Sequence, residues 1–238
     1  MKKYIIYSFL LTISLLGLTG CEKDSSMDDS RLTYYVAFKL KGDDIMLVTV
    51  NTPFVDPGVT ATLKGADASS RVKVTGNVDT NTIGLYNVTY YAINDDGFKT
   101  SVSRKVIVCN PAVTTDISGT YTSVSPTHRL RAGATVSYSG FDITITKIAP
   151  GFFFVSDFFG GYYYPRLDPK TYTSSYVMGG YVKLNEDNTI GLLTSHIASW
   201  GDSLDDLAGA VYNPTAKSLY WEASYAGSMT FYVTLNKK

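Results

Sequence analysis

The sequence predicts an all-β protein with two antiparallel domains in series. Of its 238 residues, 19 are Tyr and 11 are Phe, and only 18% are charged, a composition typical of the half-buried surfaces of pleated sheets. From Arg31 onward, short runs of β-branched and aromatic residues alternate with turn signals, and no stretch has sustained helical periodicity. We therefore expect strands throughout the folded part of the chain.

The first 20 residues have the pattern of a secretory signal peptide. Lys2 and Lys3 precede an uncharged, largely apolar run over residues 4–18, which is shorter than the ~20 residues that a transmembrane helix needs. The run ends in Leu18-Thr19-Gly20-Cys21. This ending resembles the bacterial lipobox, and the resemblance implies that Cys21 is lipidated, becomes the mature N-terminus and anchors the protein in outer-membrane lipid.

Residues 21–30 form an acidic tether with four acids and one base. The tether resembles the signal that exports lipoproteins of Bacteroidetes to the outer face of the outer membrane, although a solvated linker has the same composition. We expect a lipid-anchored protein that faces the cell exterior. The formal charge of the full chain is zero, with 21 basic and 21 acidic residues, which argues against nucleic acid as a partner.

Residues 31–109 carry the motifs of the first domain. Phe54-Val55-Asp56-Pro57-Gly58-Val59 precedes a Gly-Asn-Val-Asp-Thr segment at residues 76–80 and Gly-Leu-Tyr-Asn-Val-Thr-Tyr at residues 84–90. These motifs resemble the Ig-like repeats of bacterial surface proteins, and the resemblance implies an Ig-like β-sandwich that acts as a spacer. The strands predicted for this domain are residues 32–40, 45–50, 71–75, 84–93 and 98–108.

Residues 110–115 form a linker interrupted by Pro111, and residues 116–238 form the second domain. Its predicted strands are residues 119–125, 141–148, 152–158, 176–184, 189–195, 218–224 and 229–235. This number of antiparallel strands predicts a β-sandwich or a β-barrel. Segments such as Asp116-Ile117-Ser118-Gly119-Thr120-Tyr121 and Trp200-Gly201-Asp202-Ser203 resemble the C-terminal domain of Bacteroidetes lipoproteins that follow an Ig-like domain. Members of that family often belong to polysaccharide-utilisation systems.

Residues that could support catalysis are sparse. A glycosidase needs two carboxyl groups across the sugar, and Glu222 with Asp157 or Asp202 is the only pairing that we consider; Glu222 alternatively lies on the solvated face of an alternating strand. The remaining nucleophile and ligand candidates are isolated from one another: His128, His196 and Cys109. We therefore predict a non-catalytic protein with no cofactor and no metal site, and we expect Cys109 to be buried.

The most unusual segment is residues 151–165, which places eight aromatic residues among fifteen. Because neighbours in a strand face opposite sides, Phe152, Phe153 and Phe154 cannot share one core. After two glycines, Tyr162, Tyr163 and Tyr164 are the rings that we expect to be exposed. Two interpretations remain open. The tyrosines stack on a sugar while Arg166 and Asp168 bond its hydroxyls, or the Ig-like domain or a loop covers them.

Trp200 and Asp202 form the second candidate, since Trp200 either lines a binding site or closes one end of the barrel, whereas Trp221 is expected in the core. Together these patterns predict a non-catalytic surface lipoprotein that binds a glycan, with the Ig-like domain as spacer and outer-membrane transport or binding proteins as further partners. The alternative is a structural or adhesive lipoprotein that docks a protein partner through its aromatic face.

Overall fold

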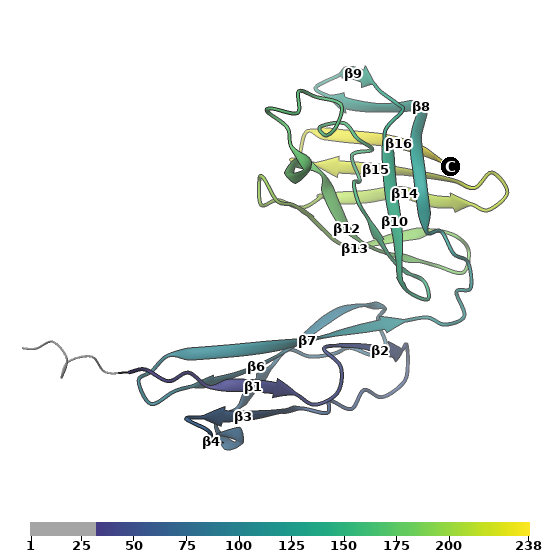
Figure 1. Cartoon of the computed structure of the whole chain (residues 1–238). Coiled ribbons are helices and arrows are strands. Elements are labelled where there is room, and N and C mark those ends of the chain that lie inside the picture. Colours follow the sequence, from purple (N-terminus) through teal and green to yellow (C-terminus); the bar gives the residue numbers. More distant parts are fainter. Residues whose placement is uncertain (1–31) are drawn as a thin grey trace, which may run out of the picture.

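The computed structural model describes residues 32–238, which fold into two β domains joined by a short linker (Figure 1). The signal peptide and tether predicted for residues 1–30, including Cys21, lie outside the described residues. Within residues 32–238 no helix is long and apolar enough to span a membrane. The predicted all-β fold class is confirmed, since the helices of this part are two short 3-10 turns, η1 (Ser69–Arg71) and η2 (Ser174–Tyr176).

The N-terminal domain is an Ig-like sandwich of two sheets. Its strands are β1 (Ala37–Leu40), β2 (Ile45–Thr49), β3 (Val59–Leu63), β4 (Ala66–Asp67), β5 (Lys73–Thr75), β6 (Gly84–Ile93) and β7 (Lys99–Cys109). One sheet has the order β1-β3-β4 and the other has the order β2-β7-β6-β5. Strands β6 and β7 form a long antiparallel hairpin, whereas β2 runs parallel to β7.

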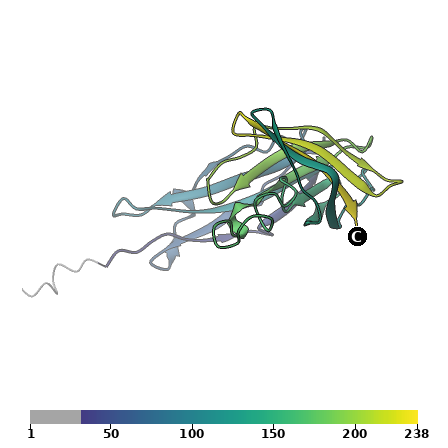
Figure 2. The same cartoon turned by 90° about the horizontal axis from the view of Figure 1, so that it is seen from above.

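The C-terminal domain is a single, nearly closed antiparallel sheet. Its strands are β8 (Gly119–Arg131), β9 (Ala134–Ser137), β10 (Asp142–Ala149), β11 (Phe152–Val155), β12 (Met178–Leu184), β13 (Ile190–Ile197), β14 (Asp206–Asn213), β15 (Ser218–Tyr225) and β16 (Met229–Lys237). The order is β13-β12-β11-β10-β8-β16-β15-β14, with β9 added to β8. A bridge between Thr189 and Val211 brings the two outermost strands together. The chain ends at the periphery of this barrel (Figure 2).

The structure differs from the sequence pattern at several strands. It contains β3, β4, β9 and β14, which the pattern does not predict. In β14, Ala208-Gly209-Ala210 lacks β-branched residues and the pairing with β15 shifts register between Ala208 and Val211, so the expected alternation is interrupted. Strand β11 ends at Val155 rather than at Phe158, because the chain turns at Asp157.

The three consecutive phenylalanines of β11 serve three different surfaces. Phe153 lies in the core of the barrel, Phe152 packs in a cluster with residues of the Ig-like domain, and Phe154 is half-buried on the outer face. The expectation that they cannot share one core is therefore confirmed. Trp221 is buried in the middle of β15, as predicted.

The two domains are joined by a small apolar contact. Ile107 and Cys109 at the end of β7 pack against Ala149 and Phe152 at the turn between β10 and β11. Burial raises the pKa of the Cys109 thiol, so this cysteine is a packing residue and a poor nucleophile. The contact places the barrel at the end of β7 that is opposite the β6–β7 hairpin (Figure 1).

A buried arginine organises the core of the Ig-like domain. Arg104 on β7 is fully buried and pairs with the carboxylate of Asp56, which also accepts a hydrogen bond from the Tyr90 hydroxyl. Its Nε donates to the carbonyl of Asp43 at 3.0 Å. The Asp-Pro-Gly motif thus supplies the counter-charge that allows a guanidinium to be buried.

Replacing Asp56 with Ala is expected to lower the free energy of unfolding by about 3 kcal/mol, because Arg104 would remain buried without its carboxylate. Urea unfolding followed by far-ultraviolet circular dichroism measures this loss. Asp44→Ala, an exposed change in the same domain, is the control and should alter stability by less than about 0.5 kcal/mol. Equal stability of the two variants would contradict the assignment.

Candidate functional site

The segment after β11 folds back into the barrel instead of crossing its surface. Residues 157–163, which we call the plug, are all buried. Trp221 Nε1 donates a hydrogen bond to the carbonyl of Phe158 at 2.8 Å, and the Tyr138 hydroxyl donates one to the carbonyl of Phe159 at 2.7 Å. These bonds satisfy plug carbonyls that would otherwise be buried without partners.

The carboxylate of Asp157 fixes the shape of the plug. Its Oδ1 accepts hydrogen bonds from the backbone N–H groups of Phe159 and Met178, each at 3.0 Å, and its Oδ2 accepts one from Gly161 at 2.8 Å. The three bonds favour the ionised form, but burial outweighs them and raises the pKa of Asp157 to about 6. One side chain therefore ties the plug to the start of β12.

Two glycines allow the plug to press against the barrel wall. Gly160 and Gly161 both have positive φ angles, of 62° and 88°. A Cβ on Gly161 would lie 2.3 Å from the Cβ of Phe141, and one on Gly160 would lie 2.9 Å from a methyl of Val233. Side chains at these two positions would force the plug away from the wall.

The plug forms the floor of an aromatic pocket of about 390 Å³. The pocket lies where β8, β13 and β15 end and β16 begins, at the end of the barrel remote from the Ig-like domain. The residues that line this aromatic pocket are Arg129, Arg131, Tyr162, Tyr163, Leu167, Tyr172, Trp200, Tyr225, Ala226 and Met229.

The rings of this pocket pack mainly edge to face around Trp200. Its ring centroid lies 5.0 Å from that of Tyr163 and 5.1 Å from that of Tyr176, both nearly perpendicular, and 6.0 Å from Tyr225 in a stacked orientation. Trp200 keeps 39% of its surface exposed, whereas Tyr163 and Tyr225 are buried. Part of the indole thus stays accessible beside rings that are themselves buried.

The expectation that Tyr162 and Tyr163 are exposed is wrong. They are only 5% and 8% exposed, because the plug carries them into the barrel end. Tyr164 is half-buried and lines a different hollow beside Pro165. The interpretation that these rings are covered is therefore nearer to the structure than the interpretation that they are exposed. They are covered by a loop and by the barrel of their own domain, and not by the Ig-like domain.

The other predicted residues take positions around the pocket. Arg166 lies 4.7 Å from the ring centroid of Tyr162. Asp168 caps the following turn by accepting from the N–H of Lys170, and Asp202 accepts from the Tyr225 hydroxyl at 2.8 Å. The fold thus brings Tyr162, Tyr163 and Trp200 together in one pocket, with Arg166 and Asp202 at its edge.

Seven of the ten lining residues were not predicted from the sequence. Arg129 and Arg131 lie at the end of β8, and Tyr172 and Tyr225 come from a loop and from the end of β15. The period-2 alternation of residues 218–225 could have indicated that Tyr225 faces inward, like Trp221, because the two residues are four positions apart in one strand. No local signal marks the arginines, since their role depends on the plug.

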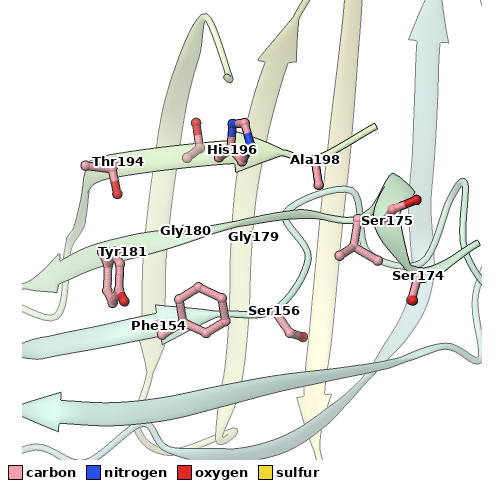
Figure 3. A pocket seen from close by; sticks show the side chains of 12 residues that line it. Phe154, Ser156, Ser174, Ser175, Gly179, Gly180, Tyr181, Thr194, His196 and Ala198 are labelled. Atoms are coloured by element: carbon pink, nitrogen blue, oxygen red, sulfur yellow. The ribbon is translucent and has the colours of Figure 1, made fainter. Parts of the chain in front are cut away.

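A second hollow, of about 320 Å³, lies on the outer face of β11, β12 and β13 (Figure 3). Gly179 lies between the Phe154 ring and His196, and a Cβ on Gly179 would lie 3.1 Å from the Phe154 ring. The rings of Phe154 and Tyr181 are 5.3 Å apart at one side. This hollow is shallow and largely apolar, with serine hydroxyls at its rim.

A serine pair separates the two hollows. Ser199 donates from its backbone N–H to the carbonyl of Ser175 at 3.1 Å, and their hydroxyl oxygens are 2.6 Å apart. Trp200, which follows Ser199, lines the aromatic pocket and packs against Tyr176, whereas Ser175 lines the outer hollow. The turn after β13 is thereby held in place relative to η2.

The carboxylates considered for glycoside hydrolysis do not converge. Glu222 accepts a hydrogen bond from Tyr220 on the face of β15 opposite to Trp221, whereas Asp157 is buried inside the barrel. Asp202 accepts from the hydroxyl of Tyr225, which lies on the same face of β15 as Trp221 and therefore opposite to Glu222. Among residues 32–238, no three His, Cys, Asp or Glu side chains gather as metal ligands.

Comparison with known proteins defines the class of this architecture. Residues 38–108 match the family model of the bacterial surface protein Ig-like domain, and residues 110–237 match the model of a C-terminal domain family. The solved lipoprotein BT2262 from Bacteroides thetaiotaomicron is 36% identical over 85% of this chain and 100% of its own, with a TM-score of 0.48. The chain belongs to the family of that lipoprotein.

More distant matches add nothing about a ligand. CBM51-2 with the INT domains of Clostridium perfringens ZmpB, solved in complex with GlcNAc, is 14% identical over 51% of this chain and 29% of its own, with a TM-score of 0.27. A Bacteroides ovatus protein of unknown function is 11% identical over 85% and 93%, with a TM-score of 0.25. No curated protein matches the sequence.

Replacing Asp157 with Asn tests the structural role of this carboxylate through pH. In wild type the raised pKa means that Asp157 binds its proton more tightly in the folded state than in the unfolded state. Its contribution to the free energy of unfolding is therefore fully present below about pH 4 and is lost as pH rises through 6. A shift of about two pKa units corresponds to a loss on the order of 3 kcal/mol. The stability difference between wild type and Asp157→Asn, from urea unfolding, should narrow by that order over this range.

The variant also removes the acceptor of the Gly161 N–H. We therefore expect Asp157→Asn to be the less stable protein at pH 4, by about 1–3 kcal/mol. A difference between the two proteins that stays constant from pH 4 to pH 7 would contradict the assignment of the pKa. Asp168→Asn, a change at an exposed turn of the same domain, provides the control.

Proposed function

We propose that this protein is a non-catalytic surface lipoprotein that binds glycans in the aromatic pocket of its C-terminal domain. The observation that carries the proposal is the partly exposed indole of Trp200 in the lining of a pocket of about 390 Å³. Pockets of a few hundred Å³, lined by aromatic rings with a few polar groups, are typical small-ligand sites. A single pyranose ring matches this size.

The chemistry of the lining favours a sugar. The apolar face of a pyranose stacks on an indole, while its hydroxyls need hydrogen-bonding partners at the edge of the ring. Trp200 supplies the indole face, and the guanidinium groups of Arg129 and Arg131 supply donors in the same pocket. The edge-to-face contacts with Tyr163 and Tyr176 hold the indole in place before a ligand arrives.

The alternative function, docking of a protein partner through an aromatic face, has less support. Protein interfaces of this type need a contiguous, flat apolar patch. Here Tyr163 and Tyr225 are buried, and Trp200 is the only large hydrophobic residue of the pocket with more than a third of its surface exposed. A concave site with one exposed ring is better suited to a small ligand.

The Ig-like domain suits the role of spacer. The backbone carbonyl of Tyr34 accepts a hydrogen bond from Asn94, in the β6–β7 hairpin, so the described chain starts near the end of β7 that is remote from the barrel. The 11 residues of β7 span about 35 Å at ~3.3 Å per residue. With Cys21 lipidated in the outer membrane, the domain would hold the pocket outward, where outer-membrane transport or binding proteins would receive its ligand.

Isothermal titration of the chain without residues 1–20 against a panel of host and plant glycans tests the proposal. At least one glycan should show saturable binding, and Trp200→Ala should weaken it by about tenfold or more because the stacking face is lost. Val211→Ala is the matched control, because Val211 on β14 is also 39% exposed but lies outside the pocket. Its affinity should equal that of wild type.

Glycan binding in this pocket would be overturned if no glycan of the panel bound, or if Trp200→Ala and wild type bound with equal affinity. Binding that is lost in Tyr181→Ala but kept in Trp200→Ala would instead move the site to the outer hollow of Figure 3. Each variant should be compared with wild type by near-ultraviolet circular dichroism before titration.

A further inference from the structure

One wall of the aromatic pocket is positively charged. Arg129 and Arg131 line the pocket, and Arg166 lies beside it against the ring of Tyr162. None of the three forms an ion pair with a residue of the described chain, whose ion pairs are Arg71–Asp95, Arg104–Asp56, Lys147–Asp116 and Lys238–Asp142. Three guanidinium groups therefore gather around one pocket without protein counter-charges.

Arg129 is the most constrained of the three. Its guanidinium carbon lies 4.8 Å from the ring centroid of Tyr162, and its Nε is buried with no hydrogen-bond acceptor among residues 32–238. Buried guanidinium donors are normally satisfied, because leaving one without an acceptor costs free energy. An acceptor brought by a ligand would remove that cost.

The acids nearest to Tyr225 form no ion pair with these arginines. Asp202 accepts from the Tyr225 hydroxyl, and Asp205 accepts from the backbone N–H of Gly227. Both carboxylates line a neighbouring hollow that also includes His196 and shares Tyr225 and Ala226 with the aromatic pocket. The positive groups of Arg129 and Arg131 also act on the Tyr163 hydroxyl, since they oppose the rise in its pKa that burial causes. That hydroxyl has only a weak bond, of 3.7 Å, to the sulfur of Met229.

We infer that the aromatic pocket selects an anionic sugar, whose carboxylate or sulfate group is held by Arg129 and Arg131 while its ring stacks on Trp200. The inference rests on the proposed glycan binding and adds the charge of the ligand. Guanidinium groups match the planar, two-oxygen geometry of such anions, and a site with two of them disfavours a neutral ring that leaves them unpaired.

Titration of the chain without residues 1–20 with matched pairs of sugars tests the inference. Oligogalacturonate is compared with its carboxyl-reduced, neutral form, and sulfated chondroitin disaccharides are compared with their desulfated form. We expect at least one anionic member to bind about tenfold or more tightly than its matched form. The pair that shows the preference distinguishes a carboxylate from a sulfate.

Arginine variants locate the preference. Arg131→Gln, an exposed change, and Arg129→Gln should each reduce binding of the anionic sugar toward that of the neutral one. Arg71→Gln removes the same charge from the Ig-like domain and should leave the affinity unchanged. Raising NaCl from about 50 mM to about 500 mM should weaken only the anionic member.

The outcomes separate this inference from the proposed function. If matched neutral and anionic sugars bind equally, with Trp200→Ala weakening both, glycan binding stands and the charge selection is wrong. If Arg71→Gln weakens binding as much as Arg131→Gln, the attraction is general and the two-arginine site is overturned. If no sugar of either kind binds, both the proposed function and the inference fail.

Discussion

The buried carboxylate of Asp157 is the contact on which the barrel end depends. It binds three backbone N–H groups, two in the plug and one at the start of β12, and so replaces the ladder hydrogen bonds that the chain gives up when β11 ends at Val155. Without this acceptor, the three backbone N–H groups would be buried without a hydrogen-bond partner when the segment turns inward. The cost is a carboxylate held away from water, which is visible as its raised pKa.

The plug links packing to the candidate site. Phe158 and Phe159 fill the barrel, while Tyr162 and Tyr163, a few residues later, form the floor of the aromatic pocket. The same segment therefore contributes apolar burial and a rigid binding surface. The two outward-facing phenylalanines of β11 also have separate roles. Phe152 packs in the contact with the Ig-like domain, and Phe154 borders the hollow of Figure 3.

The fold was predictable to a greater extent than the site. Turn dipeptides and alternation identified most strands, and the Asp-Pro-Gly motif indicated the Ig-like domain, whose Asp56 proves to neutralise Arg104. The burial of Tyr162 and Tyr163 was not predictable, because the glycines before them suggest an exposed loop as readily as a close approach to Phe141 and Val233. No sequence pattern near Arg129 and Arg131 predicts that they line a pocket, because only the long-range packing of the plug brings aromatic rings to the end of β8.

Acrylamide quenching of tryptophan fluorescence tests the central claim, that a sugar occupies the pocket under Trp200, most directly. The chain has two tryptophans, and Trp221 is fully buried while Trp200 is exposed at the pocket mouth. A bound glycan is expected to lower the quenching of wild type toward that of the Trp200→Phe variant, whose tryptophan emission comes from Trp221 alone. Saturable glycan binding that leaves the quenching of wild type unchanged would contradict it.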